Sequence, residues 1–121
     1  MHELSIAHAL VTSVTAAVAD QPGRVTEVHV RVGALSGVVR EALEFAYDVA
    51  ADGTPLAGSR VVVVEVPAVV HCASCDLDSE LVERLFFACP VCGEPTGDVR
   101  GGHELDVSHV VLDDEPAEVP A

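Results

Sequence analysis

The four cysteines are the residues of this sequence best suited to chemistry, because their spacing fits one tetrahedral metal ion. Cys72 and Cys75 form one Cys-x-x-Cys pair, and Cys89 and Cys92 form a second pair after thirteen intervening residues. Each pair can bend around an ion as a knuckle, and four thiolates complete the tetrahedron that Zn(II) prefers. No coordination position is then left for water, so we expect a structural zinc site rather than a hydrolytic one.

Residues around the second pair favour the tight turn that a knuckle needs. Pro90 fixes φ, and Gly93 tolerates a positive φ. The alternatives are two disulfides or a single redox Cys-x-x-Cys motif, but a redox motif would leave the other pair unexplained. A thiol of low pKa that exchanges disulfides would favour the redox alternative.

Composition limits the class of protein and its partners. The chain has 121 residues, enough for one modest core with a small metal-bound appendage. Its formal net charge of −14, with six arginines and no lysine, opposes binding to nucleic-acid phosphates. The start is not positively charged, and no apolar run approaches the ~18 residues of a membrane span. We therefore expect a soluble cytoplasmic protein with reduced thiols, which binds neither nucleic acid nor membrane.

Hydrophobic periodicity predicts the elements that must hold the cysteines in place. Apolar residues at spacings of three and four predict a helix over about residues 3–20, and alternation through Val28, Val30 and Val32 predicts a strand covered on one face. A second helix is expected over about residues 38–51, ended by Asp52-Gly53. The inward residues predicted for the two helices are Leu4, Ala7, Val11, Val14 and Val18, and then Val39, Ala42, Leu43, Ala46, Val49 and Ala50.

The second half of the chain predicts two strands around the cysteine segment. A loop over residues 54–58 precedes a β-branched strand over residues 60–66, which Pro67 ends. Residues 71–100 hold both cysteine pairs, with a strand or turn over residues 81–88, and are too few to fold without metal. Residues 104–112 regain strand character and have no core of their own. We expect them to pair with the first sheet, which makes the cysteine segment an insertion, followed by a disordered acidic tail over residues 113–121.

The amino terminus offers a second, different metal site. The Met1 amine, the following backbone amide and the His2 imidazole can form fused chelate rings around one ion, and such planar nitrogen donors suit Ni(II) or Cu(II) better than zinc. Glu3 or another protein can fill the fourth position, so the ion is releasable. From chemistry alone, a histidine at position two is more often a solvated terminus. The familiar amino-terminal motif for these ions has histidine at position three instead.

Several segments of the chain together carry a resemblance to a known protein family. The segments are Met1-His2-Glu3-Leu4-Ser5, residues 30–36 (VRVGALS), Phe45-Ala46, residues 53–58 (GTPLAG) and the two cysteine pairs, the second written Cys89-Pro90-Val91-Cys92. With these segments the sequence resembles the HypA/HybF hydrogenase nickel-incorporation proteins. The resemblance covers the chain from Met1 to about Leu112, and its specificity lies in the combination of segments rather than in the cysteine pairs alone.

This resemblance implies a nickel metallochaperone rather than an enzyme. It implies Ni(II) cargo at His2, with the Met1 amine and Glu3 as further ligands, and structural Zn(II) at Cys72, Cys75, Cys89 and Cys92. It also implies work with a HypB-type GTPase to load the large subunit of [NiFe] hydrogenase. The implied fold is α+β, a small three-stranded sheet with two helices and an inserted four-cysteine zinc-ribbon-like segment. In domain terms, residues 1–70 with 101–112 form the nickel-binding domain and residues 71–100 the zinc-binding segment.

The other histidines give weaker signals. His71 adjoins the first knuckle, where a role beside the sulfurs or in solvent is more plausible than replacement of a cysteine. His8 is expected at the surface, and His29, His103 and His109 have no partner spacing, so we assign them no function. No catalytic motif is present. The rival class of function is a zinc-ribbon interaction or nucleic-acid module without nickel cargo, which salt-dependent nucleic-acid binding would favour.

Overall fold

The computed structural model describes residues 3–81 and 87–113. That part of the chain contains two helices and six strands, and the second helix lies between the first two strands in the sequence. The helices are α1 (Glu3–Ala17) and α2 (Arg40–Ala51), and the strands are β1 (Arg24–Gly33), β2 (Arg60–Val66), β3 (Val69–Cys72), β4 (Leu77–Glu80), β5 (Val99–Gly101) and β6 (Leu105–Asp113). None of the described helices combines the length and the apolar character that crossing a bilayer requires.

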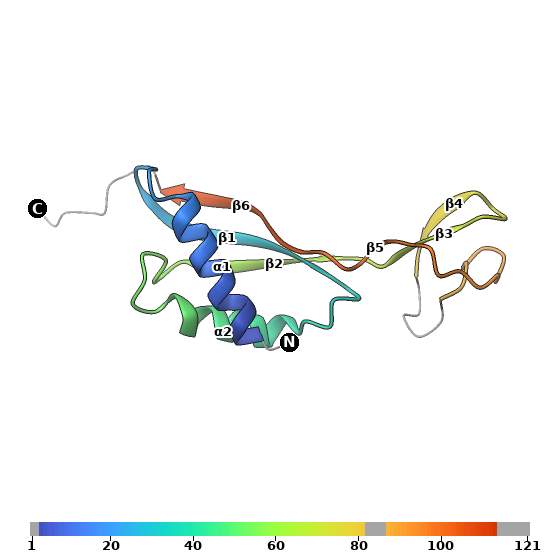
Figure 1. The fold of residues 1–121 in the computed structure, drawn as a ribbon, viewed down its shortest axis with the longest axis horizontal. Coiled ribbons are helices and arrows are strands. Elements are labelled where there is room, and N and C mark those ends of the chain that lie inside the picture. Colours follow the sequence, from blue (N-terminus) through green and yellow to red (C-terminus); the bar gives the residue numbers. More distant parts are fainter. Residues whose placement is uncertain (1–2, 82–86, 114–121) are drawn as a thin grey trace, which may run out of the picture. The chain divides into compact units, whose positions relative to one another are not determined.

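The described strands form two sheets of three strands each. In the first sheet β1 lies between β2 and β6, so the strand after the cysteine segment returns to the first strand of the chain (Figure 1). In the second sheet β3 lies between β4 and β5. The predicted return of residues 104–112 to the first sheet is therefore confirmed, as is the α+β class with its inserted four-cysteine segment. The second sheet was not predicted from the sequence.

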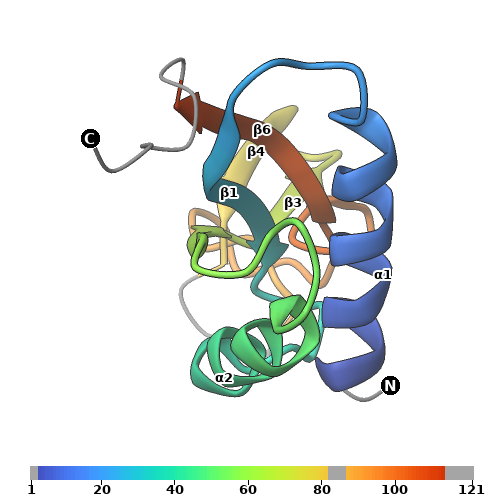
Figure 2. The same cartoon turned by 90° about the vertical axis from the view of Figure 1, so that its left-hand side faces the viewer.

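By its internal contacts the chain divides into two compact units. The first comprises Met1–Val30, Val38–Val63 and Val107–Ala121, and the second comprises Arg31–Gly37 and Val64–Asp106. In the first unit α1 and α2 pack against one another, and Figure 2 shows them side by side. Its buried side chains come from both helices, from β1 and β2, and from the turn between α2 and β2; the largest are Tyr47, Leu43, Leu56, Val28 and Val30.

Strands β1 and β2 and the carboxyl-terminal end of α2 agree with the predictions from the sequence. Val28, Val30 and Val32 are all buried, as their alternation predicts, while His29 and Arg31 lie between them and are part-exposed and exposed. Helix α2 stops at Asp52, and Gly53 then adopts a φ of 76°, the left-handed conformation that suits glycine after a helix. Strand β2 has the predicted bounds, Arg60–Val66, before Pro67.

The predicted inward faces of the helices were partly wrong. Leu4 at 43% exposure, Val39 at 53% and Val49 at 51% face solvent, and Val18 lies in the turn after α1 and is only part-buried. Ile6, Leu10, Tyr47 and Ala51 are buried in addition to the residues that were predicted correctly. Helix α1 is apolar over much of its circumference, so spacings of three and four fit more than one face.

The second unit is built around short strands rather than a large core. In the β3–β4 hairpin Val70 lies opposite Ser79, and Cys72 lies opposite Leu77. Ala68 and Val70 are buried, as are Cys72 and Cys89. The strand or turn predicted over residues 81–88 falls mostly on residues 82–86, which lie outside the described residues; Ala88 forms an isolated antiparallel bridge with Pro95.

Candidate metal centre

Both cysteine pairs lie at tight turns of the second unit, and each turn explains the spacing of its pair. Cys72 ends β3 and Cys75 lies in the turn that leads into β4, where Asp76 adopts a positive φ of 51°. At the second pair, the Gly93 N–H donates to the carbonyl of Cys89 at 2.8 Å, and the φ of Gly93 is 79°. A side chain would be strained at that φ, so Gly93 closes the knuckle as its sequence position predicts.

The two turns bring the four thiols together. Their Sγ atoms all lie within 4.8 Å of one another, and Cys72 Sγ is 3.6 Å from Cys92 Sγ. A tetrahedral zinc with Zn–S bonds of about 2.3 Å requires sulfur atoms about 3.8 Å apart. The sulfur separations therefore fit a tetrahedral ion without rearrangement of the turns, and four soft sulfur donors match Zn(II).

The surroundings of the sulfurs distinguish the four thiols. Cys72 and Cys89 are buried, Cys75 is part-buried and Cys92 is exposed. Backbone N–H groups of Cys92 and Val91 lower the pKa of Cys89 to about 7, and the Val91 N–H lies 3.4 Å from its sulfur. Hydrogen bonding to Cys92, followed by desolvation, raises the pKa of Cys75 to about 12. The unmetallated cluster thus favours one thiolate stabilised by its neighbours, and a bound cation would replace the remaining protons.

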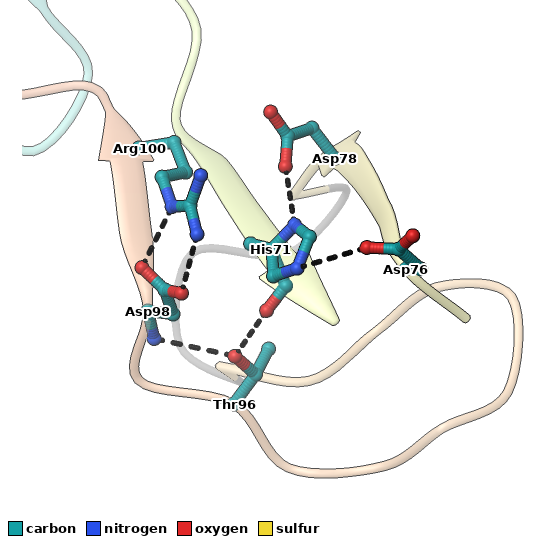
Figure 3. A network of polar contacts seen from close by, with 6 residues as sticks. All are labelled: His71, Asp76, Asp78, Thr96, Asp98 and Arg100. Atoms are coloured by element: carbon teal, nitrogen blue, oxygen red, sulfur yellow. Dashed lines mark hydrogen bonds and ion pairs between the residues drawn. The ribbon is translucent and has the colours of Figure 1, made fainter. Parts of the chain in front are cut away.

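His71 lies beside the first knuckle, but its side chain faces carboxylates (Figure 3). Its Nδ1 is 2.7 Å from Asp78 Oδ1, and its Nε2 is 3.7 Å from Asp76 Oδ1. Its backbone is held on the other side, since the His71 N–H donates to the Asp98 carbonyl at 2.8 Å and Thr96 Oγ1 donates to the His71 carbonyl at 2.6 Å.

This network fixes the strand end that carries Cys72. Arg100 makes two hydrogen bonds to Asp98, of 2.8 and 2.9 Å, and these hold the pKa of the Asp98 carboxyl below its usual range. Figure 3 shows that the network ties β3, β5 and the segment before β5 together around His71. Sequence spacing gave no sign of this network, because it joins charged and hydroxyl residues of two separate segments, residues 71–78 and 96–100.

Of the predicted nickel ligands, only Glu3 belongs to the described residues. Met1 and His2 lie outside them. Glu3 is the first residue of α1, and its Oε2 accepts a hydrogen bond of 3.4 Å from the N–H of Val39, the residue that caps α2. Glu3 therefore lies close to the start of α2 as well as at the start of α1. His8 is exposed on α1, as expected.

Comparisons with known proteins agree with this geometry. Residues 1–112 match the sequence profile of the family described as "Hydrogenase/urease nickel incorporation, metallochaperone, hypA". Hydrogenase maturation factor HypA of Chloroflexus aurantiacus is 46% identical over 108 residues, which cover 88% of this chain and 95% of that protein. Hydrogenase maturation factor HypA of a Roseiflexus species is 44% identical over 122 residues, covering 100% of this chain and 99% of that protein.

The fold is also found among solved structures. The solution structure of the Ni metallochaperone HypA from Helicobacter pylori is similar with a TM-score of 0.65 at 17% sequence identity, and the match covers 95% of this chain and 100% of that one. A second solution structure, of a HypA protein, gives a TM-score of 0.68, also at 17% identity. At that identity the likeness is one of fold.

Proposed function

Because the chain belongs to the HypA family of hydrogenase and urease nickel-incorporation metallochaperones, we propose that it binds Ni(II) at its amino terminus and delivers it for maturation of [NiFe] hydrogenase. The observation that carries the proposal is the family match, which begins at Met1 and includes all four cysteines. The protein acts as a carrier and adaptor, and no chemical step is assigned to it.

The nickel site uses the Met1 amine, a backbone amide and the His2 imidazole, with Glu3 as the adjustable ligand. Nitrogen donors of this kind suit Ni(II), and an incomplete ligand set allows exchange with an acceptor. Glu3 supports this assignment through its position, because its carboxylate lies at the amino terminus and already accepts the Val39 N–H.

The zinc site uses Cys72, Cys75, Cys89 and Cys92 and has a structural role. When bound, Zn(II) would supply the cross-link between the two turns that the few buried apolar residues of this unit do not provide. In domain terms, we assign residues 1–70 with 101–112 to nickel binding and residues 71–100 to zinc binding. Four reduced thiols suit the cytoplasm, where metal rather than disulfide formation is favoured.

The partners proposed are a HypB-type GTPase and the large subunit of [NiFe] hydrogenase. Family membership supports both, since hydrogenase maturation requires that the ion reach the enzyme. The nickel content of hydrogenase and of urease in a deletion strain would show whether the same carrier also serves a urease.

A metal titration of the untagged, zinc-loaded protein tests the proposal. We expect one tightly bound Ni(II) per chain, lost on His2→Ala and equally on addition of residues before Met1, because the extension removes the free amine. Zinc content should not change in either variant. As a control, His8→Asn alters an exposed histidine of α1 and should leave nickel binding intact. Equal nickel affinity in the extended protein would overturn the amino-terminal site.

Delivery is tested in cells. In a strain that lacks this protein, excess nickel should partly restore hydrogenase activity, because mass action replaces a carrier but not a catalyst. Absence of rescue at every nickel concentration would favour the alternative function, an interaction module whose zinc segment recognises a partner without carrying nickel.

A further inference from the structure

Two histidines that lie far apart in the sequence stack on each other in the first unit. His29 lies on β1 and His109 on β6, which are neighbouring strands (Figure 1). Their ring centroids are 4.0 Å apart and the rings are inclined by 23°. Neither histidine belongs to the four-cysteine cluster or to the amino terminus, so the proposed function leaves this pair unexplained.

Hydrogen bonds around the pair fix which nitrogen of each ring carries the proton. His29 Nε2 lies 2.9 Å from Glu27 Oε1, and because a carboxylate only accepts, Nε2 carries the proton and Nδ1 keeps the lone pair. Ser108 Oγ donates to the His29 carbonyl at 3.3 Å and lies 3.1 Å from His109 Nδ1. Since the Ser108 proton is already used, His109 Nδ1 donates, and His109 Nε2 keeps the lone pair.

Each ring therefore presents one imine nitrogen that is available to a ligand. Within the described part of the chain, no hydrogen bond reaches His29 Nδ1 or His109 Nε2. The carboxylate behind His29 is the kind of support that metal-binding histidines have, because it fixes the orientation and the tautomer of the ring. Glu27 is itself held by Arg60 at 2.8 Å, and hydrogen bonds from His29 and then Arg60 lower its pKa, so it stays ionised.

We propose that His29 and His109 form a further transition-metal site, which binds a late first-row divalent ion such as Ni(II) or Cu(II) between β1 and β6. An ion bonded at about 2.0–2.1 Å to each of two nitrogens joins atoms up to about 4 Å apart, so ring centroids 4.0 Å apart are close enough for one ion to reach both rings. A ligated ion lies in the plane of each imidazole, and the two planes are nearly parallel, so one ring must turn about χ2. That torsion is broad for histidine, and His109 is exposed, so the turn gives up only the stacking and the exposed hydrogen bond to Ser108.

Charge and geometry set the class of ion. Two neutral imidazoles backed by a carboxylate suit Cu(II), Ni(II) and Zn(II), whereas Mg(II) and Ca(II) prefer oxygen ligands. The formal net charge of −14 raises the local concentration of any cation near the protein. With two protein ligands and water in the remaining positions, the site is open, so it holds an exchangeable ion rather than a structural one.

The test uses zinc-loaded full-length protein extended before Met1, which removes the proposed amino-terminal nickel site. Ni(II) and Cu(II) are titrated calorimetrically, and we expect one ion per chain, bound more weakly than the Ni(II) of the amino terminus because fewer protein ligands hold it. His109→Asn should abolish that binding, and Glu27→Gln, which keeps the side chain but removes the charge behind His29, should weaken it about 10–100-fold. His103→Asn is the matched control, since it removes an exposed histidine outside the pair.

A second readout separates a site from loose association with surface histidines. An ion that bridges β1 and β6 stabilises the folded chain by mass action, so Ni(II) should raise the melting temperature of the extended protein and not that of His109→Asn. The proposal is overturned if the extended protein binds no ion beyond zinc, or if His103→Asn and His109→Asn weaken binding equally. Failure of the amino-terminal site would show separately, as unchanged nickel binding on extension.

Discussion

The second cysteine pair allows a graded prediction, because its two thiols occupy different surroundings. Cys89 is only 2% exposed and accepts a hydrogen bond from the Val91 N–H, whereas Cys92 is exposed. Substituting serine at either position removes one thiolate from the proposed zinc site and leaves the chain length and turn residues unchanged. We expect both variants to lose zinc affinity and Cys89→Ser to lose more.

The size of each loss follows from the coordination. Zinc binding to small structural sites is worth about 10–16 kcal/mol at neutral pH. Four comparable bonds then contribute about 2.5–4 kcal/mol each, so Cys92→Ser should raise the zinc Kd about 10²–10³-fold, at about 1.4 kcal/mol per decade. A serine at the buried position 89 leaves a hydroxyl proton without a partner, which costs about 1–3 kcal/mol more and adds roughly a further tenfold to hundredfold.

The assay is competition for zinc with a chromophoric chelator of known affinity, under reducing conditions. The matched control is Ser74→Ala, which breaks the exposed hydrogen bond to Glu94 near the site but keeps all four thiols. Amide exchange at Val70 and Cys72 reports whether β3 stays folded, and protection there should fall in the order of zinc loss. Wild-type zinc affinity in Cys92→Ser, or a smaller loss in Cys89→Ser than in Cys92→Ser, would refute the four-thiolate site or its graded burial.

Three further predictions concern pH and packing. Nickel binding at the amino terminus requires deprotonated nitrogens, including an imidazole whose unperturbed pKa is ~6.5, so nickel affinity should fall as the pH falls through that range. Zinc, held by four thiolates, should remain bound. Simultaneous release of both metals in a stepwise acid titration would contradict this prediction. The buried Tyr47 hydroxyl is 2.6 Å from Ser59 Oγ, which also donates to the Leu56 carbonyl. In urea denaturation, Ser59→Ala should lower the free energy of unfolding by about 1–3 kcal/mol, because it leaves the tyrosine hydroxyl without a partner, whereas Tyr47→Phe should lower it by only about 0.5–1.5 kcal/mol. The reverse order of the two losses would contradict this prediction. A Cβ on Gly33 would overlap the Gly102 carbonyl oxygen, so Gly33→Ala should lower stability by about 1–3 kcal/mol or more. A Cβ on Gly97 would meet no atom within 4 Å, so Gly97→Ala should be neutral in the same assay.

Sequence periodicity predicted the helices and strands well where one face of the element is buried and the other is exposed to solvent. Strand β1 alternates because its buried valines lie between part-exposed polar residues, and Pro67 ends β2 because proline lacks the N–H that a continuing strand needs. The cysteine spacing likewise identified the four-thiol cluster, since turn geometry within each pair is local. Local signals of this kind need no knowledge of the rest of the chain.

Periodicity missed a buried residue whose burial depends on a partner elsewhere in the chain. Tyr47 was not among the predicted inward residues of α2, yet it is fully buried, whereas the more apolar Phe45 is 73% exposed. The tyrosine is tolerated inside because its hydroxyl donates a hydrogen bond to Ser59 Oγ, twelve residues away, whose own proton goes to the Leu56 carbonyl. That compensation is tertiary, so the sequence of α2 alone could not reveal which aromatic ring belongs to the core.

The same limit applies with more consequence to the histidines. His29 and His109 are eighty residues apart, and no spacing rule relates them, because β6 reaches β1 only after the whole cysteine segment has intervened. Two cysteines three residues apart indicate a metal site within one turn of the chain, whereas a pair of ligands on two strands can be predicted only when the pairing of the strands is known. The return of β6 to the first sheet was predictable in outline, but its register was not, and a shift of one residue would place His109 on the opposite face of the sheet. The register of β6 therefore decides whether two histidines that share no local sequence pattern can act as one set of ligands. This is why the metal site at His29 and His109 is proposed from the structure and not from the sequence.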